Sequence, residues 1–306
     1  MSPASAVVVP ATPAEEPVLA PYGGGWQARL SLEIALREGR SVAARLAHVG
    51  PLRVQKLLWP EGPRLAHVIL LHPPSGLAAG DSLVCDLAIG PQAELLLTTP
   101  GAGRWYRADA PATQSVTVTV DDGAHLEWLP QETILHDGVS GEQTMRVDIA
   151  DRASAVGMEV LVLGRRASGE RLTQARFQSR LTLRHAGRLL YDELSRIEGA
   201  QTGAAALGSS HVSGLLWAVS PDLLPDDIAD AVEADLDAAL AATAGQAEPV
   251  DRPTIGGASR VDPHLLLVRV VGSSPQSVRG ALVAAWARLR PLLRQREAVP
   301  PRIWMT

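Results

Sequence analysis

Residues 116–123 read Val-Thr-Val-Thr-Val-Asp-Asp-Gly, and this stretch decides the fold class. Its valines and threonines alternate, so they occupy opposite faces of an extended strand. The Asp-Asp-Gly that follows is typical of a tight turn. The pattern recurs between Trp26 and Leu216, with strands at spacings of roughly 8–12 residues. It predicts a mainly β body built as a stack of sheets, a sandwich or a barrel.

The last third of the chain has a different period. Leucine, isoleucine and valine recur every fourth residue from Leu224 to Leu240, which indicates an amphipathic helix near 222–243, starting at Ser220-Pro221 or Pro225. Residues 264–271 are apolar enough for a buried strand. Ser274-Pro275 opens a second helix, expected over 275–290 and ended by Pro291. This region, 217–306, should form a small mixed α/β layer on the β body.

Composition narrows the class of protein. The chain has 306 residues, is 46% hydrophobic and carries a net charge of −5. That charge argues against a general nucleic-acid binder. The single cysteine, Cys85, excludes an intrachain disulfide and fits a reducing compartment. We find no transmembrane stretch and no signal peptide, so we expect a cytoplasmic protein without membrane contact.

The domain organisation is expected to be simple. Residues 1–25 are rich in alanine, proline and glycine, and we expect them to form a disordered tail. Residues 26–306 then form a single domain, made of a β body over 26–216 and the helix-strand-helix part over 217–306. We find no sequence repeat of fixed length.

The loop from His72 to Asp81 is the densest motif. It contains Pro73-Pro74, which force an extended exit from the preceding strand, and two glycines that permit positive φ. It is either a rigid crossover between strands or a loop that holds His72 and Asp81 against a partner or an ion.

A second loop, 98–107, contains a Gly-x-Gly but lacks the remaining features of a dinucleotide-binding or phosphate-binding loop. Its end, Arg104-Trp105-Tyr106-Arg107, has the residue types that favour the centres of protein interfaces. We expect this segment and the terminal Ile303-Trp304-Met305 to be exposed and to offer aromatic anchors, Trp304 among them, to a partner. The alternative is that both segments pack into the chain's own core.

The chain has no convincing catalytic set. Glu127 and Glu132 could serve as an acid–base pair, although a proline lies between them and a structural turn is the simpler interpretation. The eight histidines are scattered, and neither Cys-x-x-Cys nor a Gly-x-Ser-x-Gly nucleophile motif occurs. These observations favour a binding or scaffold role over an enzyme.

Taken together, the loops resemble those of the urease accessory protein UreD family, also called UreH. The resemblance runs in order from Trp26 to the C-terminus, and Ser75, Ala79 and Arg104 depart from it, since the family usually has glycine at the first two and lysine at the third. It is carried by Gly25-Trp26-Gln27-Ala28, residues 48–56, the His72-Pro73-Pro74 loop with Gly80-Asp81, Thr99-Pro100-Gly101-Ala102, Tyr106-Arg107, residues 126–132, Leu163-Gly164-Arg165 with Gly169-Glu170, and Pro301-Arg302-Ile303-Trp304.

The resemblance implies a helically wound stack of β-sheets with two helices. It also implies a non-enzymatic maturation factor that binds apo-urease and the accessory proteins UreF and UreG, and that helps insert nickel into the urease active site. No tightly bound cofactor is implied; nickel would only be in transit.

A transit role has a chemical consequence. A nickel store needs several imidazoles or thiolates, whereas weak, hydrated contact with carboxylates suits a conduit. One of Asp192 and Glu193 must point inward in a strand. We take Asp81 and Asp192 as candidates for lining a wet passage, with structural carboxylates as the alternative. A nickel-storing metallochaperone and, less favoured, a β-stack glycosidase using Glu127 and Glu132 remain open alternatives.

Overall fold

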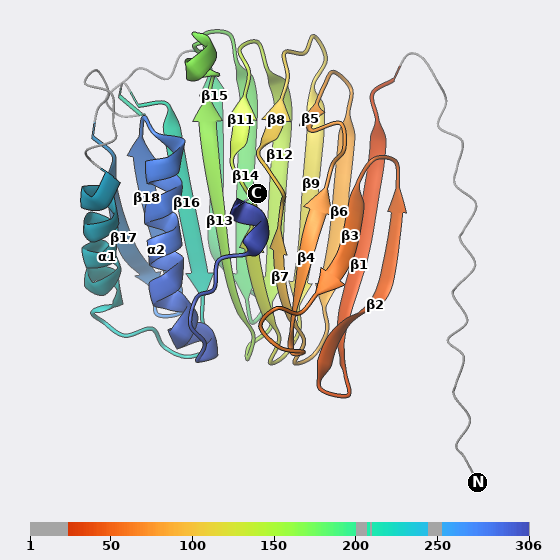
Figure 1. Cartoon of the computed structure of the whole chain (residues 1–306), viewed down its shortest axis with the longest axis vertical. Coiled ribbons are helices and arrows are strands. Elements are labelled where there is room, and N and C mark those ends of the chain that lie inside the picture. The colour runs from red at the N-terminus through yellow and green to blue at the C-terminus, as the bar shows by residue number, and fades with distance from the viewer. Residues whose placement is uncertain (1–23, 200–206, 209, 244–252, 306) are drawn as a thin grey trace.

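The computed structural model describes residues 24–199, 207–208, 210–243 and 253–305, and most of the predicted tail, 1–25, lies outside them. Two large sheets, A and B, face each other across the core (Figure 1). Sheet A contains, in spatial order, β15 (Arg188–Glu198), β14 (Arg176–His185), β12 (Ser140–Ile149), β9 (Ala112–Val120), β6 (Ser82–Ile89), β1 (Gln27–Arg37) and β2 (Arg40–Val49).

Sheet B is longer and carries three short strands beside its main row. Its main order is β17 (Ile255–Asp262), β18 (Leu265–Gly272), β16 (Val212–Val219), β13 (Ser154–Leu163), β10 (His125–Leu129), β7 (Glu94–Thr98), β4 (Leu65–Leu71) and β3 (Arg53–Leu58). The short strands are β11 (Thr133–Leu135), β8 (Gly103–Trp105) and β5 (Gly76–Leu77). The described helices are α1 (Ile228–Thr243) and α2 (Pro275–Arg294), with the 3-10 turns η1 (Arg166–Ser168) and η3 (Arg302–Met305).

The middle of the chain winds as a helix of strands. Each winding runs along a strand of sheet B, crosses to a strand of sheet A and returns, so that successive strands within each sheet are parallel. Leu65, Glu94, His125 and Ser154 pair at one level of sheet B, and successive windings therefore take 29, 31 and 29 residues. The mainly β, helically wound fold expected from the sequence is confirmed.

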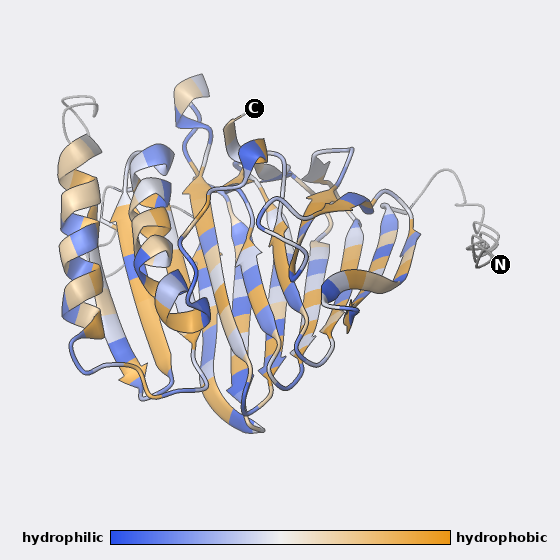
Figure 2. Ribbon diagram, turned by 60° about the horizontal axis from the view of Figure 1, so that its bottom comes forward, coloured by the Kyte–Doolittle hydropathy of each residue, from blue (hydrophilic) through white to orange (hydrophobic). Residues whose placement is uncertain are grey.

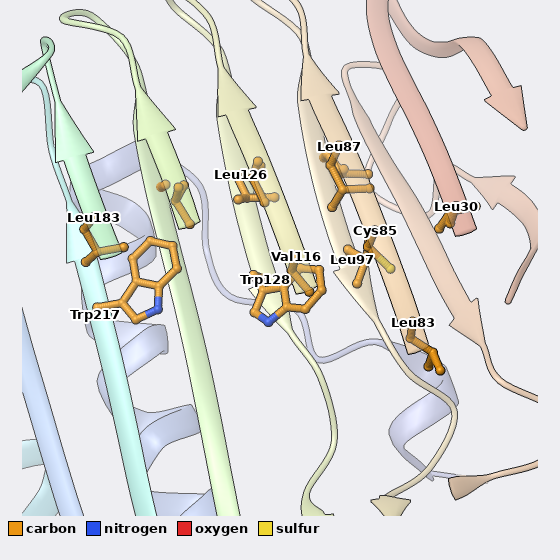
Figure 3. Packing of buried hydrophobic residues seen from close by; sticks show 14 of the residues in the cluster. Leu30, Leu83, Cys85, Leu87, Leu97, Val116, Leu126, Trp128, Leu183 and Trp217 are labelled. Atoms are coloured by element: carbon orange, nitrogen blue, oxygen red, sulfur yellow. The ribbon is translucent and has the colours of Figure 1, made fainter. Parts of the chain in front are cut away.

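Alternation of side chains places one core between the two sheets. Figure 2 shows the alternating colours along the strands of sheet A, and Figure 3 shows Cys85, Trp128 and Trp217 among the side chains that fill the space between the sheets. A second core lies between the outer face of sheet B and the two helices, with Trp286 fully buried in it. The strands β16 and β18 contribute to both cores, which explains why their sequences are almost continuously apolar.

The helices differ from the sequence prediction at their ends. The first begins at Ile228, later than expected, although its four-residue stripe of Ile228, Val232 and Leu236 is buried as predicted. The second is capped by the Ser274 side chain, which accepts a hydrogen bond from Ser277 N at 3.2 Å. The prediction that Pro291 ends this helix is wrong.

The helix passes through Pro291 and ends at Arg294, and Gln295 forms its C-cap with a φ of 50°. A proline at this position removes one backbone hydrogen bond from the helix. Burial of the side chains on either side holds the last turn in place: Arg290 is fully buried and Leu293 is 8% exposed. The edge strand β17 was not predicted, because its half-exposed residues lack a clear apolar run. Within the described residues, none of the helices has the length and apolar character needed to cross a bilayer.

Candidate functional site

Three neighbouring parallel strands of sheet B break at the same height. Strands β4, β7 and β10 stop, pass through short segments that contain proline, and resume as β5, β8 and β11 in the same spatial order. The segments are 72–75, 99–102 and 130–132, with Pro73-Pro74, Pro100 and Pro130. Because proline has no backbone N–H to donate, the ladder of hydrogen bonds is interrupted across all three strands.

The break widens away from β13, which is continuous. Between the same two levels of the sheet, β13 takes five residues from Gly157 to Val162. Between these levels the chain takes six residues from β10 to β11 (Trp128 to Ile134) and seven from β7 to β8 (Leu97 to Arg104). It takes eight from β4 to β5 (Val68 to Gly76). Each strand carries one more residue than its neighbour, so the extra chain cannot lie flat in the sheet.

A cavity of about 340 Å³ lies between the two sheets behind this break. All three broken segments line it, through residues such as His72, Thr99 and Gln131. The opposite wall comes from inward-facing residues of sheet A. They include Gln114, Gln143 and Ser179. The exposed lining residues Ser75, Gly101 and Gly103 belong to the break or its upper edge, so the cavity reaches the surface there.

Glu159 is the carboxylate on the wall of this cavity. It lies in β13 beside the break, in a strand that is otherwise almost entirely apolar and buried. Gln143 Nε2 donates a hydrogen bond to its Oε1. Burial, opposed by the Gln143 hydrogen bond and aided by the charge of Glu193, raises the pKa of Glu159 to about 7. This side chain can therefore change its charge near neutral pH.

The inward member of the Asp192–Glu193 pair is Glu193, so the expectation for Asp192 is wrong. In the register of β14 and β15, Asp192 pairs with Thr182, between Leu181 and Leu183, which face the core. Asp192 therefore points outward, where Arg180 Nε and Nη2 donate to its two oxygens at 2.9 and 2.6 Å.

Glu193 points toward the inside of the stack and bonds to side chains at its edge. It accepts hydrogen bonds from Tyr191 Oη at 2.6 Å and from Arg269 Nη2 at 2.8 Å. Arg269 lies in β18 of sheet B, so this ion pair connects the two sheets at the edge beyond β15.

Asp81 stabilises the loop from His72 to Asp81 through its side-chain hydrogen bonds. Its side chain is 3% exposed and accepts hydrogen bonds from Trp26 N at 2.6 Å and Ala78 N at 2.7 Å. It therefore joins the start of β1 to the loop that His72 begins. His72 itself lines the cavity, its Nε2 is buried without a hydrogen-bond partner among the described residues, and burial lowers its pKa against the attraction of Asp81.

The segment Arg104–Arg107 is less exposed than an interaction surface requires. Trp105 is 2% exposed and packs edge-to-face on Phe177 with ring centres 5.0 Å apart, so its expected role as a surface anchor is wrong. Arg104 and Trp105 both line the cavity. Tyr106 is half-buried against His136, and Arg107 alone of the four is exposed, 3.8 Å from Asp137.

Trp304 also packs on the chain itself. It lies in η3 on the outer face of sheet B, half-buried, with its ring centre 6.0 Å from that of Trp286.

Glu127 lies in a buried charged cluster and not in an open cleft. Trp286 Nε1 donates to it at 2.8 Å and Arg290 Nε at 2.9 Å, and its side chain is 1% exposed. Arg290 also forms hydrogen bonds to both oxygens of Glu61, at 2.7 and 2.9 Å. Since its oxygens already accept from helix α2, Glu127 has no access to a sugar, and the glycosidase alternative loses its geometric basis.

Sequence reasoning found His72, Arg104 and Trp105 of the cavity wall and missed Glu159, Gln143 and the cavity itself. A lone glutamate within an apolar strand was the available signal for Glu159. In the described part of the chain, no group of three or more histidine, cysteine, aspartate or glutamate side chains is arranged to hold a metal ion.

Comparison with known proteins identifies the family. The family model described as UreD urease accessory protein matches residues 27–305. This chain belongs to the UreD family. Proteins named urease accessory protein UreD are similar over 92% of this chain and 95% of their own length: that of Azoarcus sp. strain BH72 is 41% identical, and that of Delftia acidovorans 38%. UreD membership assigns the chain a role in urease maturation, in keeping with relatives that are named accessory proteins.

Proposed function

We propose that this chain is a scaffold and conduit in urease maturation, which binds apo-urease together with UreF and UreG and passes nickel toward the urease active site. The cavity between the sheets is the observation that carries the proposal. Its largely apolar wall also carries amide and hydroxyl groups and the carboxylate of Glu159, which suit a hydrated divalent cation. Nickel is cargo in this account and not a resident cofactor.

The chemistry of the wall favours passage over storage. Tight nickel binding uses several imidazoles or thiolates. The thiol of Cys85 lines the cavity, but burial raises its pKa to about 12, so it stays protonated at neutral pH. A cation that meets one carboxylate with a raised pKa and neutral oxygens can leave again. A nickel-storing chaperone would instead retain nickel through dialysis.

The candidates for the passage change with the geometry. Glu159 takes the place of Asp192, whose side chain is outside the cavity and paired with Arg180. Asp81 does not line the cavity, but its charge acts on His72, which does, so it remains a candidate for the approach to the cavity in addition to its structural bonds.

Binding partners would cover apolar surface that the chain leaves exposed. Leu223, Ile255 and Met305 are 71%, 61% and 77% exposed, and Trp26 is half-exposed at the start of β1. A partner that covers any of these side chains removes apolar area from water, which favours binding. We expect the isolated chain to be poorly soluble and to become more soluble when it is produced with UreF.

The test of the proposed function is co-purification followed by activation. The chain is produced with UreF, UreG and apo-urease, the complex is isolated through a tag on this chain, and nickel is added. We expect UreF and urease to co-purify, and urease activity to appear only when this chain is present. A monomeric, soluble chain that binds neither partner, or urease activated equally without it, would contradict the proposal.

A further inference from the structure

The C-terminal end of the chain covers the outer side of the strand breaks. In Figure 1, η3 lies in front of sheet B below the labels of β8 and β11. Trp304 Nε1 donates a 2.8 Å hydrogen bond to Thr98 Oγ1, and Thr98 Oγ1 donates to Leu129 O at 2.6 Å. Thr98 and Leu129 are the last residues of β7 and β10. Trp304 therefore sits on the lower rim of the breaks.

The same rim separates this cover from the cavity. Thr98 contacts Trp304, whereas the next residue, Thr99, lines the cavity. Leu129 accepts the Thr98 bond, and the next residue, Pro130, again lines the cavity. One layer of interrupted backbone thus lies between Trp304 and the cavity.

Arg279 of α2 holds the indole of Trp304 at an electrostatic cost. Its guanidinium carbon lies 4.3 Å from the centre of the Trp304 ring. Its Nη1 and Nη2 atoms are buried and find no hydrogen-bond acceptor among the described residues, since Glu132 Oε1 is 3.9 Å from Nη1. Buried donors without acceptors cost free energy, so the closed arrangement leaves Arg279 poorly satisfied. Departure of Trp304 would let Arg279 approach Glu132.

We propose that η3 is a removable cover, and that the cavity, which already reaches the surface at Ser75, Gly101 and Gly103, gains a second and wider opening to the outer face of sheet B when Trp304 leaves its site. Three separate contacts hold the segment. Trp304 donates to Thr98, Arg290 donates to the backbone carbonyl of Glu297, and Arg296 pairs with Glu94. A short segment held by a few separate side-chain contacts can open without unfolding the sheets. The inference rests on the proposed function in one respect: if the chain conducts nickel, the cover would control an opening of that conduit.

Cys85 provides a direct test, because it is the only cysteine in the sequence and lines the cavity. The rate of its modification by a small cationic methanethiosulfonate reagent is measured on the full chain. We expect Trp304→Ala to react at least about tenfold faster than wild type, because the open state is more populated. Trp304→Phe keeps a ring over Arg279 and should stay much closer to the wild-type rate.

The control separates opening of the cover from general loosening. Leu236→Ala removes a buried side chain of α1 in the same helical layer, away from the cover, and should react at the wild-type rate. Circular dichroism confirms that each variant is folded. A wild-type rate for Trp304→Ala, or an equal acceleration by Leu236→Ala, would overturn the cover.

The labelling experiment contains no nickel, urease or partner. If the cavity does not carry nickel, the labelling result still stands. If the labelling rates do not change, the cover is wrong while the conduit can still be tested separately.

Discussion

A single carboxylate inside an apolar strand, that of Glu159, titrates near neutral pH in the folded protein. Glu159 lines the cavity, bonded to Gln143 and close to Glu193. Its pKa rises from 4.5 to about 7 because burial disfavours the charged form. In the unfolded chain the glutamate ionises at the lower pH. Between these values the folded state binds the extra proton, so the contribution of Glu159 to stability falls as pH rises.

Replacing this carboxylate should remove that dependence. Relative to Glu159→Gln, wild type should lose stability as pH rises from 4.5 to about 7, with no further change above. The difference should reach at most about 3 kcal/mol. Urea denaturation of both proteins at pH 5 and pH 8 measures it. A difference in unfolding free energy that is independent of pH would contradict the assigned pKa.

Asp81 allows two roles to be separated at one residue. Asp81→Leu leaves the Trp26 and Ala78 amides unpaired, and we expect a loss of about 1–3 kcal/mol in unfolding free energy. Asp81→Asn, which keeps one acceptor oxygen, should lose less. Denaturation and pull-down of UreF are measured side by side. Full stability and UreF binding together with lost urease activation in the leucine variant would instead support a passage role.

At the scale of elements, the end of α2 is clamped to sheet B by buried charge. Arg290 is fully buried between Glu61 and Glu127, and Glu94 pairs with Arg294 and Arg296 nearby. Burial opposes ionisation of Glu61, but hydrogen bonds from His67 and Arg290 outweigh it and hold its pKa at about 2. The clamp therefore contributes fully above about pH 4.5 and weakens as pH falls toward 2.

Removing the buried clamp should cost much more unfolding free energy than removing a surface ion pair on the same helix. Arg290→Met leaves two buried carboxylates without their cation and should cost about 3–5 kcal/mol. Arg288→Met removes a half-exposed pair with Asp235 and should cost about 0–1 kcal/mol. Denaturation midpoints at pH 7 compare the two, and equal losses would show that the buried cluster does not anchor the helix.

The elements were predictable where one period dominates. The valine–threonine alternation of β9 and the four-residue stripe of α1 each reflect one buried face. The end of α2 was not predictable, because Pro291 signals a stop and the clamp on Arg290 lies far away in sequence. Glu159 was visible as an odd residue in its strand, but its position on a cavity depends on three proline segments from different windings.

At the scale of the molecule, the winding repeats in space and not in sequence. Windings of 29 to 31 residues align prolines from three segments, although their residues differ from one winding to the next. Sequence alone could indicate a mainly β body and, through its resemblance to UreD, a helical winding. It could not place the breaks at one height, because register is fixed only when neighbouring strands pair.

The most direct test of the conduit is to plug the cavity and measure nickel in urease. Ser179 faces the cavity from β14, and its neighbour Gln178 lies on the opposite face of the strand. Ser179→Phe and Gln178→Phe therefore form a matched pair. Each variant is assembled with UreF, UreG and apo-urease, and the nickel content of the urease is determined at limiting nickel. The account predicts an intact complex and nickel-poor urease for Ser179→Phe, with wild-type nickel content for Gln178→Phe. Normal nickel content in urease matured by a folded, assembled Ser179→Phe variant would contradict passage through this cavity.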